Sequence, residues 1–171
     1  ATLGKARNLV QSEASAEALT VNERAQELAE INADLVGARE GTAGRAALLD
    51  ARDKALRGLA EEFGISPTIN ADGTADVMLS GTPPVALVTG AVASSVSVTF
   101  AADGTAAFAV GGATFTPTGG AMAGRASALA EMAGLQTGLD ALAVSAITLS
   151  NSAQANGVDV NGAPGGPLFS G

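Results

Sequence analysis

Residues 44–64 read GRAALLDARDKALRGLAEEFG, and this stretch has the clearest helical pattern in the chain. Its apolar residues recur at steps of three and four, so they share one face of an α-helix, with charge on the opposite face. Acid-before-base pairs four residues apart favour ion pairs along that charged face. Gly64 stands where a left-handed C-cap residue is expected, which predicts the end of the helix. The apolar face consists of Leu48, Leu49, Ala55, Leu56, Leu59 and Phe63, and the two charge pairs are Asp50 with Lys54 and Asp53 with Arg57.

The segment before this helix repeats small and apolar residues with the same spacing from about residue 5 to residue 35. A seam sustained for about four heptads predicts a long helix, about 45 Å if unbroken, that must pair with other helices. Thr20 and Glu23 fit a capping box, which would divide the segment into two helices, although the pattern favours one. Glycines in residues 37–44 predict a loop that returns the chain antiparallel.

After Gly64 the pattern changes to strands and turns. The tetrapeptide Ala-Asp-Gly-Thr occurs at residues 71–74 and again at 102–105. Each copy predicts a tight hairpin turn, because Asp-Gly readily adopts positive φ angles. Two independent turns are favoured over an internal duplication, since the flanking residues do not align. Alternation of Val96, Val98 and Phe100 with Ser and Thr predicts a half-buried strand in an antiparallel sheet of roughly four to six strands.

Helical spacing returns from residue 121 to about residue 156. Three glycines inside this segment each cost about 1 kcal/mol relative to alanine, so they are expected where another backbone approaches or the helix bends. They are Gly124, Gly134 and Gly138.

The predicted fold class is therefore α+β. It has a bundle of about three long, coiled-coil-like helices, with a small antiparallel β-sheet inserted between the second and the third. The expected divisions are a helical bundle from residues 1–64 and 119–157, a β subdomain at 65–118, and a turn-rich tail at 158–171.

Composition narrows the possible functions. The 171 residues include no His, Cys, Trp or Tyr, which excludes disulfides, thiolate metal sites and thiol redox chemistry. The formal net charge is −8, and eight of the nine basic residues precede residue 64. Because nucleic acids bind clustered Lys and Arg, no nucleic-acid partner is expected. The uncharged run at 77–102 contains Pro83, Pro84 and glycines, so it predicts strands and turns rather than a membrane span.

No pattern indicates catalysis or a cofactor. Without His or Cys, a nucleophile would need Lys5 or Lys54 as its base, and both lie on predicted solvent faces. Two carboxylate pairs, Glu61 with Glu62 and Asp50 with Asp53, fit a solvated helix face better than an acid-base site. Oxygen-rich turns at 70–73 and 159–162 lack the spaced acidic ligands of a calcium loop. We therefore expect no enzyme activity, no metal and no cofactor.

Two unrelated motifs carry a family resemblance. A helix with Ile-Asn near its end precedes the Leu-Leu-Asp-x-Arg-Asp-x-x-Leu-x-x-Leu pattern, and a Gly- and Asp-rich tail ending in Leu-Phe closes the chain. A glycine-rich start of the long helix at 119–125 lies between them. In this order they resemble the flagellar hook-associated protein of the first hook-filament junction, the FlgK family. The matching residues are Ile31, Asn32, Leu48, Leu49, Asp50, Arg52, Asp53, Leu56 and Leu59, followed by Asn151, Gly157, Asp159, Gly162 and Phe169.

The resemblance implies a structural, non-enzymatic axial component of the bacterial flagellum that joins hook to filament. It implies type III export, an extracellular location, self-association of the full-length protein, and contacts with the hook protein and the second junction protein, without a membrane partner. It also implies that terminal segments are missing at both ends, and we expect the fragment alone to be a monomer. A secreted adhesin or surface-binding module, using the Ser- and Thr-rich β face at residues 92–118, stays open as the alternative.

Overall fold

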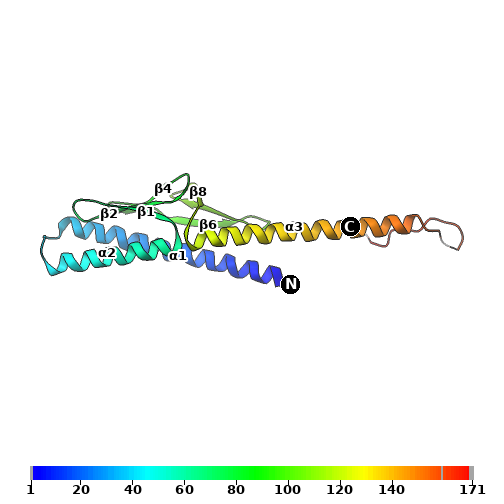
Figure 1. The fold of residues 1–171 in the computed structure, drawn as a ribbon, viewed down its shortest axis with the longest axis horizontal. Coiled ribbons are helices and arrows are strands. Elements are labelled where there is room, and N and C mark those ends of the chain that lie inside the picture. Colours follow the sequence, from blue (N-terminus) through cyan, green and yellow to red (C-terminus); the bar gives the residue numbers. More distant parts are fainter. Residues whose placement is uncertain (1, 159, 170–171) are drawn as a thin grey trace. The chain divides into compact units, whose positions relative to one another are not determined.

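The computed structural model describes residues 2–158 and 160–169. It divides into two compact units, residues 1–130 and residues 131–171, which we call the first and second units. The chain has three long helices, α1 (Thr2–Gly37), α2 (Ala43–Glu62) and α3 (Gly120–Ala155) (Figure 1). In sequence, a strand-rich segment lies between α2 and α3. The α+β class, with an antiparallel sheet region between the second and third helices, is confirmed.

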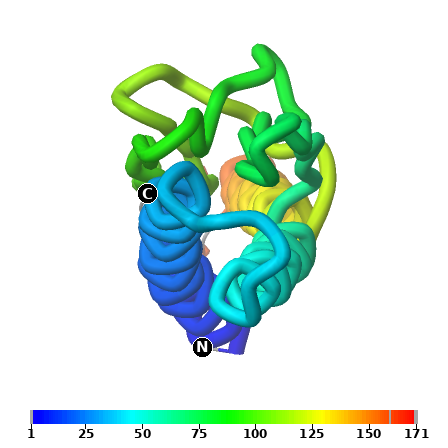
Figure 2. Tube along the Cα trace, turned by 90° about the vertical axis from the view of Figure 1, so that its left-hand side faces the viewer, coloured from blue at the N-terminus to red at the C-terminus, as the bar shows by residue number. Residues whose placement is uncertain are grey.

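Helices α1 and α2 lie side by side in the first unit, and the strands cover one side of the pair (Figure 2). Helix α1 runs unbroken through Thr20, whose hydroxyl donates to the Ala16 carbonyl as it would inside a helix. The capping-box break is therefore absent. The buried seam of α1 consists mainly of small side chains, which lets the neighbouring elements approach closely. Its members are Ala14, Ala18, Val21, Ala25, Leu28, Ala29, Ile31, Asn32 and Leu35.

Helix α2 begins at a Thr42 cap, whose hydroxyl accepts the Arg45 N–H at 3.2 Å. Its C-terminal end differs from the predicted left-handed cap, because Phe63 is extended and Gly64 does not have a positive φ. Gly64 instead allows a close approach, because a Cβ there would lie only 3.3 Å from the Gly119 Cα. The two ends of the strand-rich segment therefore meet at a contact between two glycines.

The strands form two four-stranded antiparallel sheets rather than the one expected. The chain passes between the sheets at Ser80, whose carbonyl accepts hydrogen bonds from the Thr118 N–H and hydroxyl. Two of the eight strands have only two residues each, too short for any periodicity to predict them. One sheet has the order β1 (Ile65–Ile69), β2 (Ala75–Leu79), β4 (Val85–Thr89), β5 (Val92–Ala93), and the other has the order β3 (Gly81–Thr82), β8 (Ala113–Pro117), β7 (Ala106–Val110), β6 (Val96–Phe100).

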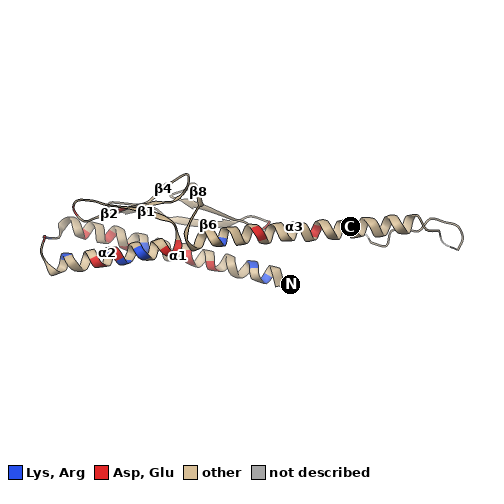
Figure 3. Cartoon of the chain, viewed as in Figure 1, with Lys and Arg blue, Asp and Glu red and all other residues tan. Residues whose placement is uncertain are grey.

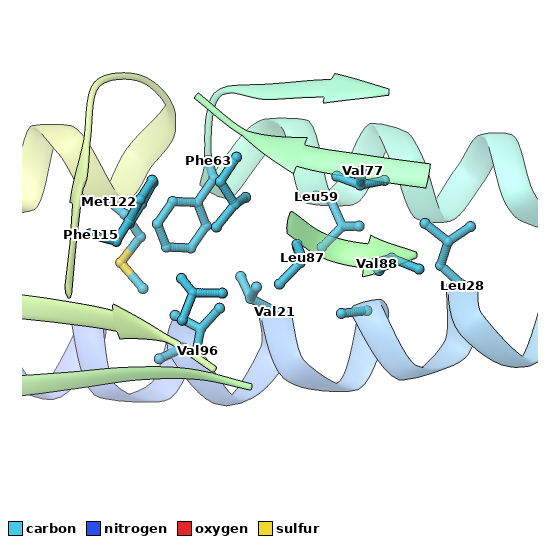
Figure 4. Close-up of a cluster of buried hydrophobic side chains, with 14 of the residues drawn as sticks. Val21, Leu28, Leu59, Phe63, Val77, Leu87, Val88, Val96, Phe115 and Met122 are labelled. Carbon is cyan, nitrogen blue, oxygen red and sulfur yellow. The ribbon is translucent and has the colours of Figure 1, made fainter. Parts of the chain in front are cut away.

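One hydrophobic core joins α1, the end of α2, both sheets and the start of α3 (Figure 4). The ring of Phe63 lies at its centre, 6.5 Å from the Phe108 ring in an edge-on arrangement and 6.0 Å from the Phe115 ring. Met122 at the start of α3 is fully buried in the same cluster. This shared core places the strands and residues 120–130 in one compact unit with α1 and α2.

Candidate assembly site

The first motif places its residues in different environments. Ile31 and Leu59 are buried, Leu48, Leu49 and Leu56 are half-buried, and Asp50 is exposed. The apolar members therefore support the fold, and Asp50 is available to solvent or to another molecule, whereas the Arg52 side chain is only 12% exposed.

The predicted ion pairs Asp50–Lys54 and Asp53–Arg57 do not form among the described residues. Asp53 instead accepts two hydrogen bonds from the neighbouring Arg52, at 2.9 and 2.7 Å. Arg52 Nη1 also donates to a backbone carbonyl, that of Gly73, at 2.6 Å, which fixes the guanidinium beside Asp53. The tertiary contact thus decides which charge pair forms.

Asn32 attaches α1 to the first sheet. Its side chain is 1% exposed; Nδ2 donates to the Ala75 carbonyl at 2.8 Å and to the Gly90 carbonyl at 2.7 Å. Oδ1 accepts the Ala75 N–H at 2.8 Å. The amide thus satisfies both backbone groups of one strand residue, as a neighbouring strand would.

Asn22 makes the same kind of contact with the second sheet, and sequence reasoning missed it. Its Nδ2 donates to the Val96 carbonyl at 2.9 Å, and its Oδ1 accepts the Val96 N–H at 2.7 Å. A polar side chain directly beside the buried Val21 was the only available signal.

The two Ala-Asp-Gly-Thr turns have matching internal geometry. In each, an Asp Oδ1 accepts both the N–H and the hydroxyl of the Thr two residues later, at 3.0 and 2.7 Å for Asp72 and at 2.9 and 2.7 Å for Asp103. These hydrogen bonds lower the pKa of both carboxyl groups. The bond from the Thr74 hydroxyl has the largest effect on Asp72, and the bond from the Thr105 N–H has the largest effect on Asp103.

Each turn also rests on a helix. Arg45 of α2 donates to the Asp72 carbonyl at 2.5 Å, and Gln11 of α1 donates to the Gly104 carbonyl at 3.1 Å. A Cβ at Gly104 would overlap the Arg7 side chain. The hairpins are therefore anchored at separate positions on the helix pair.

Arg125 joins the start of α3 to α1. It forms ion pairs with Glu17 and, at 3.8 Å, with Glu13. Burial raises the pKa of Glu17, nearby Arg125 opposes that rise, and Glu62 and Glu13 add to it. Two carboxyl groups of α1 thus pair with one guanidinium of α3, and Glu62 at the end of α2 lies near Glu17.

The second motif closes the tail of the second unit back onto α3. Asn151 Nδ2 donates to the Phe169 carbonyl at 2.8 Å, and Oδ1 accepts the N–H groups of Leu168 and Phe169 at 2.8 and 3.0 Å. The Gly157 carbonyl accepts the Gly165 N–H at 3.0 Å, and Gly162 has a φ of 81°. Asp159 lies outside the described residues.

An apolar stripe remains exposed on α3 in the second unit. We call it the α3 stripe, and its side chains are between 56% and 76% exposed. Steps of four, three and seven place its members on one side of a helix, in the pattern of a coiled-coil seam. The positions beside this seam carry no charge between residues 132 and 153, and few charged residues appear on α3 (Figure 3). The α3 stripe consists of Leu135, Leu139, Leu142 and Leu149.

Three glycines inside α3 have no close neighbour among the described residues. A Cβ built on Gly124, Gly134 or Gly138 would have no atom within 4 Å among those surveyed. The expected close backbone is thus not supplied by the described residues. By length and composition alone, α3 also suffices to cross a membrane, and almost none of its most apolar stretch is buried. Both observations describe a helix surface without a covering partner.

Among the described residues, no group of three or more Asp or Glu side chains is placed to hold a metal ion.

Comparison with known proteins agrees with these motifs. The family model of the helical domain of the flagellar hook-associated protein FlgK matches residues 1–169. The solved structure of the flagellar hook junction protein FlgK from Burkholderia pseudomallei is similar over 99% of this chain, with 26% identity and a TM-score of 0.82. The chain spans 32% of that protein's length. No curated protein matches the sequence.

Proposed function

Because the chain belongs to the family of the flagellar hook-associated protein FlgK, we propose that it is the helical part of the axial component that joins hook to filament. Members of this family are structural proteins of the bacterial flagellum that assemble with other flagellar proteins, and the chain has such a hook-associated role. The location at the hook-filament junction, outside the cell after type III export, belongs to the proposal.

The observation that carries the proposal is the exposed α3 stripe. Large apolar side chains in a row are costly to leave in water, and such a row typically marks a protein contact. Uncharged flanks and small residues favour close helix packing, which suits a permanent structural assembly. A catalytic site would instead need convergent polar groups in a pocket.

The proposed partners are further copies of the full-length protein, the hook protein and the second junction protein. The division into a helical bundle (1–64 and 119–157), a β subdomain (65–118) and a tail is part of the same proposal. We also propose a structural role for the motif residues. The chain alone is expected to be a monomer, and light scattering over a range of concentrations would test this.

The test uses the full-length protein in a strain that lacks its own copy. Leu139→Glu and Leu142→Glu place charge in the α3 stripe, and Val144→Glu places it on the opposite side of the same helix, where Val144 is also exposed. We expect the first two variants to shed filaments or lose motility, and Val144→Glu to resemble the unmodified protein. Secreted protein levels, measured in parallel, separate failed assembly from failed export.

The junction role would be wrong if deletion left filaments attached, or if the full-length protein were absent from the hook tip in immunoelectron microscopy. Attached filaments together with saturable glycan binding by the purified chain would instead favour the adhesin. Equal loss of function in all three variants would reject the α3 stripe as the contact surface.

A further inference from the structure

A groove runs along one side of α1 in the first unit, beside the hairpin formed by β4 and β5. Three adjoining hollows of about 370, 400 and 360 Å³ compose it. The first two share Gln26 and Ala93, and the last two share Ala33 and Ala91, so the depression is continuous. It follows α1 from Leu19 to Val36, about 26 Å at the helical rise. We call it the α1 groove.

The α1 groove combines small and exposed apolar side chains. Alanines line its middle on both sides, and three larger residues are open to solvent: Leu19 is 65% exposed, Val92 69% and Val36 70%. On α1, the lining residues recur at helical steps of three and four, the spacing that receives the ridge of another helix. Strand β5 offers only two residues, which is too short for a partner to add as a strand.

The charge in the α1 groove has one sign. Acidic side chains line all three hollows, and no Lys or Arg lines any of them. Two of the acids are already used inside the fold, because Asp72 caps its turn and Asp76 accepts the Gly90 N–H at 2.7 Å. Glu23 and Glu30 make no hydrogen bond or ion pair among the described residues.

We propose that the α1 groove binds an α-helix of a partner protein that carries Lys or Arg seven residues apart. Glu23 and Glu30 are separated by seven residues, two helical turns, so both point to the same side of α1. Bases at the same spacing on an adjacent helix would meet both carboxylates, while apolar residues between them cover Val92 and apolar residues beyond them cover Leu19 and Val36. The α1 groove lies on a different helix from the α3 stripe. Binding of a helix in the α1 groove goes beyond the junction role and does not depend on that role.

The test uses the whole chain and a synthetic probe. The probe is a fluorescein-labelled amphipathic helical peptide of about 18 residues, matched in length to the α1 groove, with leucines on one side and two lysines seven residues apart. A second peptide has glutamate in place of the lysines. We expect fluorescence anisotropy to show saturable binding of the lysine peptide, weakening with added salt, and little binding of the glutamate peptide.

Matched variants separate the α1 groove from general attraction to an acidic protein. The double change Glu23→Gln and Glu30→Gln should weaken binding about five- to tenfold. Glu40→Gln with Asp50→Asn removes the same charge from exposed positions outside the α1 groove and should change binding less than about twofold. Ala33→Trp fills the middle of the α1 groove from an exposed position and should abolish binding. Far-UV circular dichroism verifies that each variant is folded.

NMR shift changes on peptide addition should concentrate on residues 19–36 and 89–95. The proposal is overturned if both double variants weaken binding equally, if the glutamate peptide binds as well, or if the shifts map elsewhere. It is also overturned if light scattering shows a dimer that the Ala33→Trp change converts to a monomer, because a second copy of this chain would then cover the α1 groove. Loss of filament attachment in the α3 variants does not enter this test, so the two proposals fail separately.

Discussion

Replacing Asn32 with alanine should destabilise the first unit by about 2–4 kcal/mol. The change removes three hydrogen bonds of 2.7–2.8 Å, two of them to Ala75 of β2, which is fully buried. The Ala75 N–H then has no partner, and an orphaned buried group costs about 1–3 kcal/mol. The Ala75 carbonyl adds about 1 kcal/mol, whereas Gly90 is only half-buried and can turn to water. Domain stabilities are about 5–15 kcal/mol, so the variant should stay folded.

Urea unfolding followed by far-UV circular dichroism is the appropriate assay, because the chain has no Trp or Tyr for intrinsic fluorescence. The midpoint should fall while the denaturant dependence stays constant. Asn22→Ala is the matched control: it removes two bonds of the same kind from a half-buried site and should cost about 1 kcal/mol. Asn32→Asp keeps an acceptor for Ala75 but turns a carboxylate towards two carbonyl groups, so it should be more harmful at neutral than at acidic pH.

The reasoning is refuted if Asn32→Ala costs less than about 1 kcal/mol, or no more than Asn22→Ala. Either result would mean that water or a small shift of β2 replaces the amide. If Asn32→Asp has the same effect at neutral and acidic pH, packing rather than hydrogen bonding determines the cost.

Leu59→Asp should unfold the first unit, because Leu59 is fully buried and a charge there costs about 5 kcal/mol or more. Leu56 is half-buried, so the Leu56→Asp variant should remain folded with a lower melting temperature. Similar melting curves for the two variants would mean that the faces of α2 are misassigned. Gly120→Ala should lower the free energy of unfolding in urea by about 2–4 kcal/mol, since Gly120 has a φ of 77° and an added Cβ would clash with the end of α2. Gly124→Ala is the control: an added Cβ there meets open space, so the change should be neutral or stabilising. Burial raises the folded-state pKa of Glu17, so its contribution to stability is complete below the unfolded pKa and is lost as pH rises through the folded value. Glu17→Gln should therefore gain stability relative to the unmodified chain between about pH 4 and pH 7, and a relative loss over that range would contradict the sign.

Much of the candidate site could be located from sequence, but its contacts could not. The motif search singled out Asn32 and Asn151, and both make multiple backbone hydrogen bonds. Nothing in their local spacing shows which backbone they bind, since Asn32 and Ala75 are 43 residues apart. Asn22 was missed for the same reason, because a polar residue beside a helix seam is ordinarily solvated.

The sequence by itself determined the helix α2, though not its end at Glu62, the long α1, the two Asp-Gly hairpins and the α+β class. These depend on periodicity and turn chemistry, which act within a few residues along the chain. Only the tertiary structure decided that the strands form two sheets, that Gly64 packs closely against Gly119, and that Asp53 pairs with Arg52. Each of these depends on which distant segments come together, and burial and close packing decide that over the whole fold.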